Sequence, residues 1–349
     1  MTVIAHQERP SRTELGRCLM ESGALSSDWA PAFAAVDRAA FLPQVMWPFI
    51  PAEQPGEAPH SRAVTVDRST DPAAWYGYAD SDLSVVTQWD DGAHRGDHPG
   101  TVPTSSSSQP SVVFRLLAAL DADAGMRVLD AGTGTGETAA LLAHRCGAAN
   151  VTTIDVDPAV SAAAQERLCT LGLYAEVVTD DALAGRPDRG PCDRLLCTFG
   201  VRSIPRAWVE RARPGGVIVA PYGTHLQQPA AAAPLTVHPD GTASGPFATA
   251  VEFMKPSRTA RCGRTPSSTS RSGRARPERP CNPTSSPRRT TPAASPSRTS
   301  RTPPTPDPTA LRLPGGTPSP IARGRPYGGR KSTGRASSTS KALGARGTP

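Results

Sequence analysis

The sequence contains no apolar run that approaches the ~20 residues of a membrane-spanning helix. The first residues, MTVIAHQERPSRTELGRC, lack the apolar core of a secretory signal peptide. The seven cysteines include no C-x-x-C pair, and their number is odd, which favours reduced thiols. These absences predict a cytoplasmic protein with reduced thiols and no membrane partner.

Acidic residues are scarce in one part of the chain, the segment 256–349. It holds 19 of the 38 Lys and Arg residues but two of the 31 Asp and Glu residues, a net charge of +17. The remainder therefore carries −10, although the whole chain is at +7. An acidic remainder makes nucleic acid a poor partner for the folded part.

The same segment lacks any helical or strand periodicity. It holds 17 of the 38 prolines, with Ser, Thr, Arg and Gly between them, and cannot bury enough apolar area to offset the entropy of ordering. We expect it to be disordered. Two alternatives remain: a basic arm for RNA or membranes, and translation out of frame, which the coding DNA would reveal as a patterned apolar sequence in another frame.

A metal site is expected nowhere. His94 and His98 in "HRGDH" have a suggestive spacing, but they sit in a Gly- and Asp-rich stretch without a further cluster of ligands. We expect a solvated loop there.

The middle of the chain alternates between strand-like and helix-like patterns. Residues 12–41 are expected to be helical with a break at Ser-Ser-Asp, and 44–100 contain the apolar islands "WPFI", "AAWYGY" and "LSVVTQW", interpreted as short strands or pocket walls. Strands and helices then alternate through 126–223, which predicts an α/β fold with a mostly parallel, doubly wound sheet. Within it, "IPRAWVERARPGG" is expected to be a helix that ends at its glycines, and a hairpin turning at Pro239-Asp240-Gly241 should follow. The expected domains are an N-terminal substrate-side region at 1–100, a cofactor-binding domain at 101–255 and the tail at 256–349.

The loop after the first strand of the alternation reads "DAGTGTGE". Its glycines permit a close backbone approach to a ligand and a sharp turn into a helix. In a dinucleotide-binding G-x-G-x-x-G the third glycine would fall at 137, where this chain has Glu137. The residues expected at the cofactor are Asp130, Gly132, Thr133, Gly134, Thr135, Gly136, Asp155 and Asp181.

Acidic residues follow three successive strands: Asp130, then Asp155, then Asp180 and Asp181. The carboxyl ends of parallel strands form the ligand-binding edge of open α/β sheets. Three carboxylates suit a ligand with a cationic end, a ribose and an adenine amine, and would repel a pyrophosphate. S-adenosyl-L-methionine matches that description, whereas the plainer interpretation is that these acids only cap helices and turns.

The successive segments resemble a known family. "RVLDAGTGTGETAALLA", "VTTIDVDPAV", "VVTDDALAG", "CDRLLCTFGVRSIPRAW" and "RPGGVIVAPYG" are similar to the motifs of protein-L-isoaspartate O-methyltransferases, over roughly residues 30–255. The resemblance implies a Rossmann-like fold, S-adenosyl-L-methionine as cofactor, and methyl esterification of isoaspartyl or aspartyl carboxylates in a protein or peptide.

The resemblance also implies a role for a serine. Family members carry Ser-Ala-Pro or Ser-Gln-Pro before the first core helix, where the serine contacts the substrate carboxylate, and here that motif is Ser108-Gln109-Pro110. Ser108 is therefore the expected catalytic residue. Ser105, Ser106 and Ser107 are interpreted as loop, and a plain linker is the alternative for the whole cluster.

Some positions depart from the family pattern. Glu137 stands where an aromatic residue is common, Asp180 and Ala182 where glycines are common, and "TFGV" replaces a run of small residues. We expect these changes to line the cofactor pocket, so a catalytically impaired methyltransferase-fold binding protein is the alternative function. The segment "DPAAWYGYADSDLSVVTQWDDG" resembles actinobacterial relatives that methylate ribosomally made peptides, which leaves repair and peptide tailoring both open.

Overall fold

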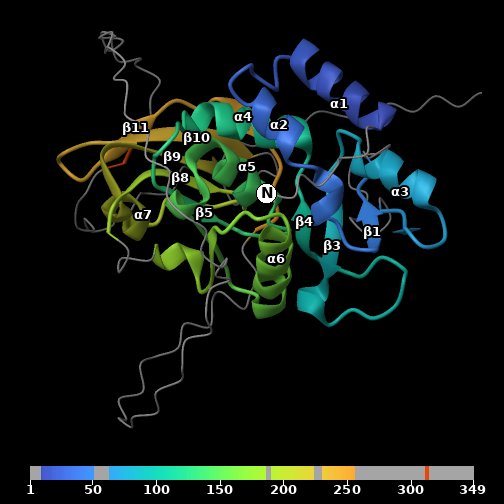
Figure 1. Ribbon diagram of the computed structural model, residues 1–349. Coiled ribbons are helices and arrows are strands. Elements are labelled where there is room, and N and C mark those ends of the chain that lie inside the picture. The colour runs from blue at the N-terminus through green and yellow to red at the C-terminus, as the bar shows by residue number, and fades with distance from the viewer. Residues whose placement is uncertain (1–8, 51–62, 186–189, 224–229, 256–310, 314–349) are drawn as a thin grey trace, which may run out of the picture. The chain divides into compact units, whose positions relative to one another are not determined.

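The computed structural model describes residues 9–50, 63–185, 190–223, 230–255 and 311–313, all of which lie in one compact unit, Met1–Gly315. In this part of the chain, nine strands form a large sheet and four form a small one. Figure 1 shows the large sheet with helices packed against it and the small sheet beside it.

The large sheet has the order β13-β11-β10-β9-β8-β5-β6-β7, and β12 also pairs with β10. Strands β5 to β9 run parallel, whereas β10 to β13 pair antiparallel. Their bounds are β5 Val128–Ala131, β6 Val151–Asp155, β7 Glu176–Thr179, β8 Cys192–Cys197, β9 Ala212–Tyr222, β10 Ala230–Val237, β11 Ala243–Gly245, β12 Thr249–Val251 and β13 Leu311–Leu313. The expected mostly parallel α/β sheet is confirmed.

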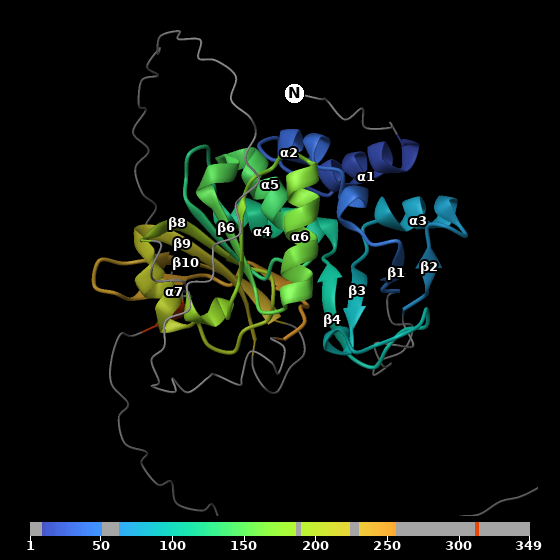
Figure 2. The same ribbon diagram turned by 60° about the horizontal axis from the view of Figure 1, so that its bottom comes forward.

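Helices cover both faces of this sheet. Successive strand residues point to opposite faces, so neighbouring residues of β5 belong to different core clusters. Val128 packs with one core cluster, which includes α4 (Pro110–Leu120) and α5 (Glu137–Cys146). Leu129 packs with the other, which includes Trp208 of α7 (Arg206–Arg211). Helix α6 (Pro158–Thr170) follows β6 and lies between the large sheet and the small one in Figure 2.

The small sheet is antiparallel and has the order β2-β1-β3-β4. Its strands are β1 Val45–Pro48, β2 Val66–Asp67, β3 Val85–Trp89 and β4 Pro103–Ser107. The domain boundary expected near residue 100 therefore falls between two neighbouring strands of one sheet.

The N-terminal helical prediction is confirmed. Helices α1 (Pro10–Glu21) and α2 (Ala30–Ala35) are separated by a turn that contains the Ser-Ser-Asp break, and a 3-10 turn, η1 (Arg38–Phe41), follows. Three further 3-10 turns are η3 (Asp90–Gly92), η4 (Ala148–Asn150) and η5 (Ala182–Ala184).

Two expectations about local structure are wrong. The island "AAWYGY" lies in a helix, α3 (Pro72–Ala79), because Asp71 accepts a hydrogen bond from the Ala74 amide and Pro72 suits the first turn. The helix expected to end at Gly215 and Gly216 ends at Arg211, and the glycines lie in β9 where its register against β8 shifts.

The predicted hairpin is confirmed. The turn at Pro239-Asp240-Gly241 joins β10 and β11, with Gly241 at a φ of +77°. The tail lies outside the described residues except for Leu311–Leu313, which pair with β11.

We expect Leu117→Ala to lower the free energy of unfolding by about 2–5 kcal/mol, because Leu117 of α4 is 0% exposed in the core against the large sheet. Urea unfolding measures this. Met20→Ala on α1 is the matched control, since Met20 is 54% exposed, and should change stability by less than about 0.5 kcal/mol. Equal effects of the two variants would contradict this arrangement of the core.

Candidate functional site

The glycine-rich loop lies between β5 and α5 and is held against the ends of two neighbouring strands. The amides of Gly132 and Thr133 donate to the Ile154 carbonyl at 2.9 and 3.1 Å. Gly132 has a φ of +104°, and a Cβ there would lie 2.6 Å from Thr198 Oγ1 after β8. A side chain at position 132 would therefore be strained and would collide with its neighbour.

The end of the loop is equally closely packed. Gly136 has a φ of +91°, and a Cβ there would lie 3.2 Å from the Ala164 Cβ of α6. Gly134 has a φ of +51°, and a Cβ there would lie 3.3 Å from the Ser106 carbonyl oxygen of β4. The loop thus reaches from the parallel sheet to the small sheet.

Asp130 is the most deeply buried of the expected cofactor residues, with 0% exposure. Its Oδ2 accepts from Thr153 Oγ1 at 2.8 Å, whereas its Oδ1 is buried and has no partner among the described residues. Burial raises the pKa of Asp130 to about 7. A buried carboxylate oxygen without a donor is costly unless a ligand supplies a donor or a positive charge.

Asp155 ends β6 and holds the loop in place. Its Oδ2 accepts from the Gly134 amide at 2.9 Å, and its Oδ1 accepts from the Asp157 amide at 3.1 Å. Burial raises its pKa, an effect that these amides partly offset. Because a carboxylate has about four acceptor sites, it retains capacity for hydroxyl groups of a ligand.

The other expected cofactor residues have more local roles. Thr133 is buried and its hydroxyl bonds Thr153 Oγ1 at 2.8 Å. Thr135 is also buried, and its Oγ1 accepts from the Glu137 amide at 3.5 Å. Asp181 follows β7 and accepts from the Leu183 amide at 2.9 Å, so it caps η5. All eight expected residues lie at or just beyond the carboxyl ends of β5, β6 and β7.

The serine cluster is not a linker, and the expectation that Ser105, Ser106 and Ser107 are loop is wrong. They form β4 with Pro103 and Thr104, and Val85 and Val86 of β3 pair with Ser107 and Ser106. Strand pairing orders the segment because its backbone hydrogen-bonding groups find partners there.

Ser108 lies between the end of β4 and the first turn of α4. It is half-buried, and no described residue forms a hydrogen bond with its hydroxyl. Asp82 fixes the helix start beside it, because its Oδ1 accepts from the Ser111 amide at 2.8 Å. The Ser108 hydroxyl therefore sits on an ordered backbone and can bind a ligand.

The guanidinium of Arg38 connects this serine segment to the rest of the N-terminal region. Arg38 is 3% exposed. Its Nε donates to Ser107 Oγ at 2.9 Å, and its terminal nitrogens donate to the carbonyls of Ala79, Ser81, Leu83, Ser107 and Ser108.

Glu137 completes this buried cluster from the other side. Its Oε2 accepts from Ser107 Oγ at 2.7 Å and lies 3.6 Å from Arg38 Nε. Burial raises the pKa of Glu137, while the Arg38 charge opposes that rise. Since Glu137 is the first residue of α5, the Arg38–Ser107–Glu137 cluster connects β4 directly to the end of the glycine-rich loop.

This geometry corrects the expectation that Glu137, which departs from the family pattern, lines the cofactor pocket. The Glu137 side chain points to Arg38 and Ser107, and so belongs to the cluster rather than to a cofactor pocket. Asp180 is exposed and accepts from the Asp181 amide. Ala182 is buried and its carbonyl accepts from Trp208 Nε1 at 2.8 Å. Sequence reasoning missed Arg38, although an arginine inside the apolar stretch "AAVDRAAFLP" is a signal for a buried charge with partners.

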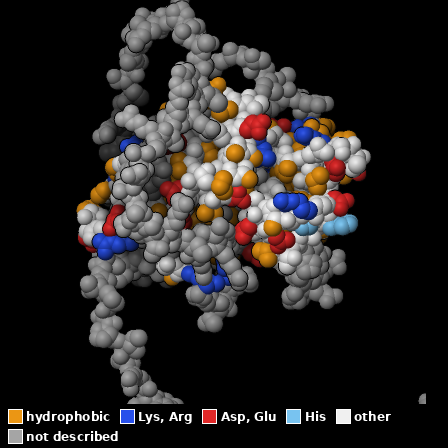
Figure 3. Space-filling view, turned by 90° about the horizontal axis from the view of Figure 1, so that it is seen from below, with side chains coloured by type: hydrophobic (Ala, Val, Ile, Leu, Met, Phe, Trp, Pro, Cys, Tyr) orange, Lys and Arg blue, Asp and Glu red, His pale blue; other side chains and the backbone are white. Residues whose placement is uncertain are grey.

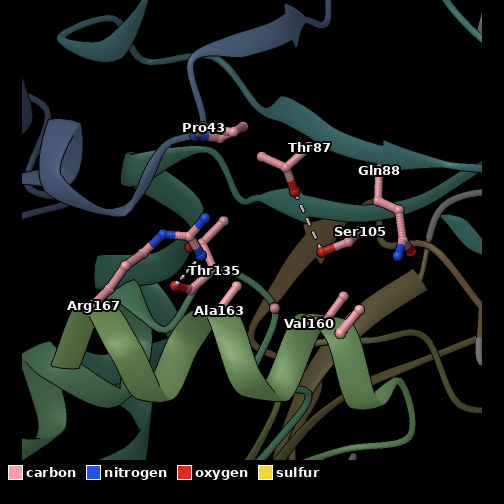
Figure 4. A pocket seen from close by; sticks show the side chains of 10 residues that line it. Pro43, Thr87, Gln88, Ser105, Thr135, Val160, Ala163 and Arg167 are labelled. Carbon is pink, nitrogen blue, oxygen red and sulfur yellow. Dashed lines mark hydrogen bonds between the residues drawn. The ribbon is translucent and has the colours of Figure 1, made fainter. Parts of the chain in front are cut away.

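A cavity of about 170 Å³ adjoins the loop. It is lined by Pro43, Thr87, Gln88, Ser105, Gly134, Thr135, Ala159, Val160, Ala163 and Arg167. Figure 4 shows side chains of α6 facing those of β3 and β4 across it.

Other kinds of site find no support in the described part of the chain. No group of three or more His, Cys, Asp or Glu residues there could hold a metal ion. His94 Nε2 bonds the His98 carbonyl at 2.7 Å. None of the helices described has the length and apolarity to cross a membrane.

The residues fit a cationic ligand that carries hydroxyl groups. Asp130 offers a buried oxygen without a donor, Asp155 offers acceptor capacity, and the glycines provide a cradle in which Cβ atoms would collide with Thr198 or with β4. S-adenosyl-L-methionine has these features, and Asp130, Asp155 and the loop are the residues that would hold it.

Comparisons with known proteins agree with the fold. The sequence model of the protein-L-isoaspartate(D-aspartate) O-methyltransferase family matches residues 61–253. A protein-L-isoaspartate O-methyltransferase of Azorhizobium caulinodans is 42% identical over 117 residues, which are 33% of this chain and 53% of that protein. One of Thermococcus onnurineus is 35% identical over 137 residues, or 38% and 61% of the two chains.

The chain spans about half the length of the curated relatives it matches. A solved protein-L-isoaspartate O-methyltransferase structure superposes with a TM-score of 0.54 at 23% identity, covering 70% of this chain and 66% of that one. It shows the likeness of fold. The resemblance to the actinobacterial branch is not tested by these matches and stays a prediction.

We expect Arg38→Met to lower the free energy of unfolding by about 3–5 kcal/mol, because it leaves Glu137 buried without its cation. The double variant Arg38→Met/Glu137→Met should recover part of that loss, and urea unfolding measures both. Arg17→Met is the control, since Arg17 pairs with Glu14 and Glu21 on the exposed side of α1, and should cost at most about 1 kcal/mol. A loss at Arg38 no larger than at Arg17 would contradict the role of the cluster.

Proposed function

Because the chain belongs to the protein-L-isoaspartate(D-aspartate) O-methyltransferase family, we propose that it transfers a methyl group from S-adenosyl-L-methionine to an isoaspartyl or aspartyl carboxylate of a protein or peptide. The observation that carries this proposal is the contact between two segments. The glycine-rich loop approaches β4 so closely that a Cβ on Gly134 would lie 3.3 Å from the Ser106 carbonyl. The cofactor loop and the serine segment thus adjoin one another.

The proposed roles follow from the geometry. The loop of Gly132, Thr133, Gly134, Thr135 and Gly136 would cradle the cofactor. Asp155 would accept from the ribose hydroxyls, Asp181 would contact the adenine, and the charge of Asp130 would offset the positive charge of the ligand. Residues 101–255 would bind the cofactor, and residues 1–100 would contribute to the substrate side.

The reaction requires few catalytic groups from the protein. When bound, the cofactor supplies an electrophilic methyl group on a sulfonium. A substrate carboxylate is ionised and nucleophilic at neutral pH, so no base has to remove a proton. Catalysis then depends on alignment and exclusion of water. Ser108 would donate its hydroxyl hydrogen to one carboxylate oxygen and leave the other oxygen directed at the methyl group.

The surface and the thiols support the proposed partners and location. Figure 3 shows charged side chains of both signs interspersed over the face that it draws. The thiols of Cys18, Cys146, Cys192 and Cys197 are free. We infer a cytoplasmic enzyme whose substrate is a protein or peptide.

Asp155→Ala should weaken binding of S-adenosyl-L-methionine by about tenfold or more, because a charge-assisted hydrogen bond contributes about 1.5–3 kcal/mol. The Gly134 amide also loses its acceptor, so the loop should loosen. Calorimetric titration measures the dissociation constant. Asp28→Ala is the control, since Asp28 is exposed before α2. An unchanged affinity in Asp155→Ala would refute the assignment of this residue to the cofactor.

Ser108→Ala should leave cofactor affinity nearly unchanged and lower methyl transfer to an isoaspartyl peptide about tenfold or more, because a hydrogen bond to a charged group is lost. The assay counts labelled methyl ester. Ser106→Ala is the matched control on β4 and should be close to neutral. Equal rates for the two variants would remove Ser108 from the site.

A further inference from the structure

The cavity between α6 and the small sheet contains a charge that the proposed chemistry does not use. Arg167, on α6, is half-buried and lines the cavity. Its Nη1 donates to the Thr135 carbonyl at 3.3 Å. No carboxylate among the described residues forms an ion pair with it.

The positive charge of Arg167 is unfavourable in its partly buried position. Burial lowers the pKa of Arg167, and the charge of Glu166 offsets this only in part, so the surroundings disfavour the cation. A partly buried cation without a counter-ion is stabilised when an anion binds beside it. In Figure 4 the guanidinium lies at one end of the cavity, on the side of Pro43 and Thr135.

Hydroxyl groups lie on the wall of the cavity opposite α6. Thr87 Oγ1 and Ser105 Oγ are 3.3 Å apart, so one hydroxyl donates to the other and the second keeps a hydrogen for a ligand. The side chain of Gln88 is held in place beside them, because its Nε2 donates to Asp157 Oδ2 at 2.7 Å and its Oε1 accepts from Thr104 Oγ1 at 2.9 Å. Arginine with hydroxyl donors is a set that suits a carboxylate.

The cavity has room for a side chain. Its 170 Å³ exceed the ~10–15 Å³ that one water molecule requires by about tenfold, so one acidic side chain can enter it. Ser105 lines the cavity, and Ser108 follows three residues later, just beyond the end of β4, about 10 Å away at ~3.4 Å per residue. An extended peptide spans that distance in about three residues.

We propose that this cavity binds a second carboxylate of the peptide substrate, carried about three residues from the carboxylate that is methylated. The inference rests on the proposed function, because it takes Ser108 as the site of methylation. It adds a preference for acidic peptides, with Arg167 as the residue that recognises the second acid.

The test uses isoaspartyl peptides that differ at one position, with Glu or Gln three residues before or after the isoaspartate. Fluorescence anisotropy with the full chain and S-adenosylhomocysteine measures their dissociation constants. With the variable residue either before or after the isoaspartate, we expect the Glu peptide to bind about tenfold more tightly than the Gln peptide. This ratio should fall to about one in Arg167→Gln and recover in part in Arg167→Lys. Arg115→Gln is the control, since Arg115 is exposed on α4, and should keep the tenfold ratio.

The outcomes separate this inference from the proposed function. Equal binding of the Glu and Gln peptides to the unaltered protein would overturn the inference. If both peptides were nevertheless methylated, the proposed function would stand. Discrimination that depends on Arg167 without methylation would support the cavity and refute the function. If Arg167→Gln weakened S-adenosyl-L-methionine instead and left the peptide ratio unchanged, the cavity would belong to the cofactor and the inference would be wrong.

Discussion

The buried guanidinium of Arg38 is the constraint on which the site depends. It satisfies carbonyls from the end of α3, from the segment before β3 and from the end of β4, and it faces the carboxylate of Glu137. A buried charge is tolerated only when its donors are satisfied and its counter-charge is close. Arg38 therefore connects the N-terminal region, the serine strand and the start of α5, and its loss would leave Glu137 buried without a counter-charge.

This constraint explains how two sheets can form one site. The parallel sheet supplies the glycine-rich loop and the carboxylates at the ends of its strands. The small sheet supplies β4, whose backbone lies against Gly134. Neither part alone presents both a cradle for a cofactor and an ordered hydroxyl for a substrate. The buried cluster holds the two together, and alignment is what a reaction between an ionised carboxylate and a methyl sulfonium requires from a protein.

The sequence predicted the parallel sheet well, because buried strands and amphipathic helices have periods that can be counted between Val128 and Tyr222. It also predicted that Asp155 and the glycines lie at the carboxyl ends of the parallel strands, since a turn after a buried strand demands special backbone angles. It did not predict β4, because a run of serines has no apolar alternation and is ordered by its pairing with β3. It failed at Glu137 for a similar reason: the partner of this residue, Arg38, lies 99 residues away in the chain. Contacts of this kind depend on tertiary packing, which local patterns do not encode.

We propose that this fold brings an isoaspartyl carboxylate to a bound methyl donor. The most direct measurement is incubation with methyl-labelled S-adenosyl-L-methionine and a pair of peptides that differ only in an isoaspartyl or an aspartyl linkage, followed by release of methanol in base. We expect base-labile label on the isoaspartyl peptide and less of it with Ser108→Ala. Cofactor binding without label on either peptide would refute the proposed methyl transfer and would indicate a methyltransferase-fold binding protein instead.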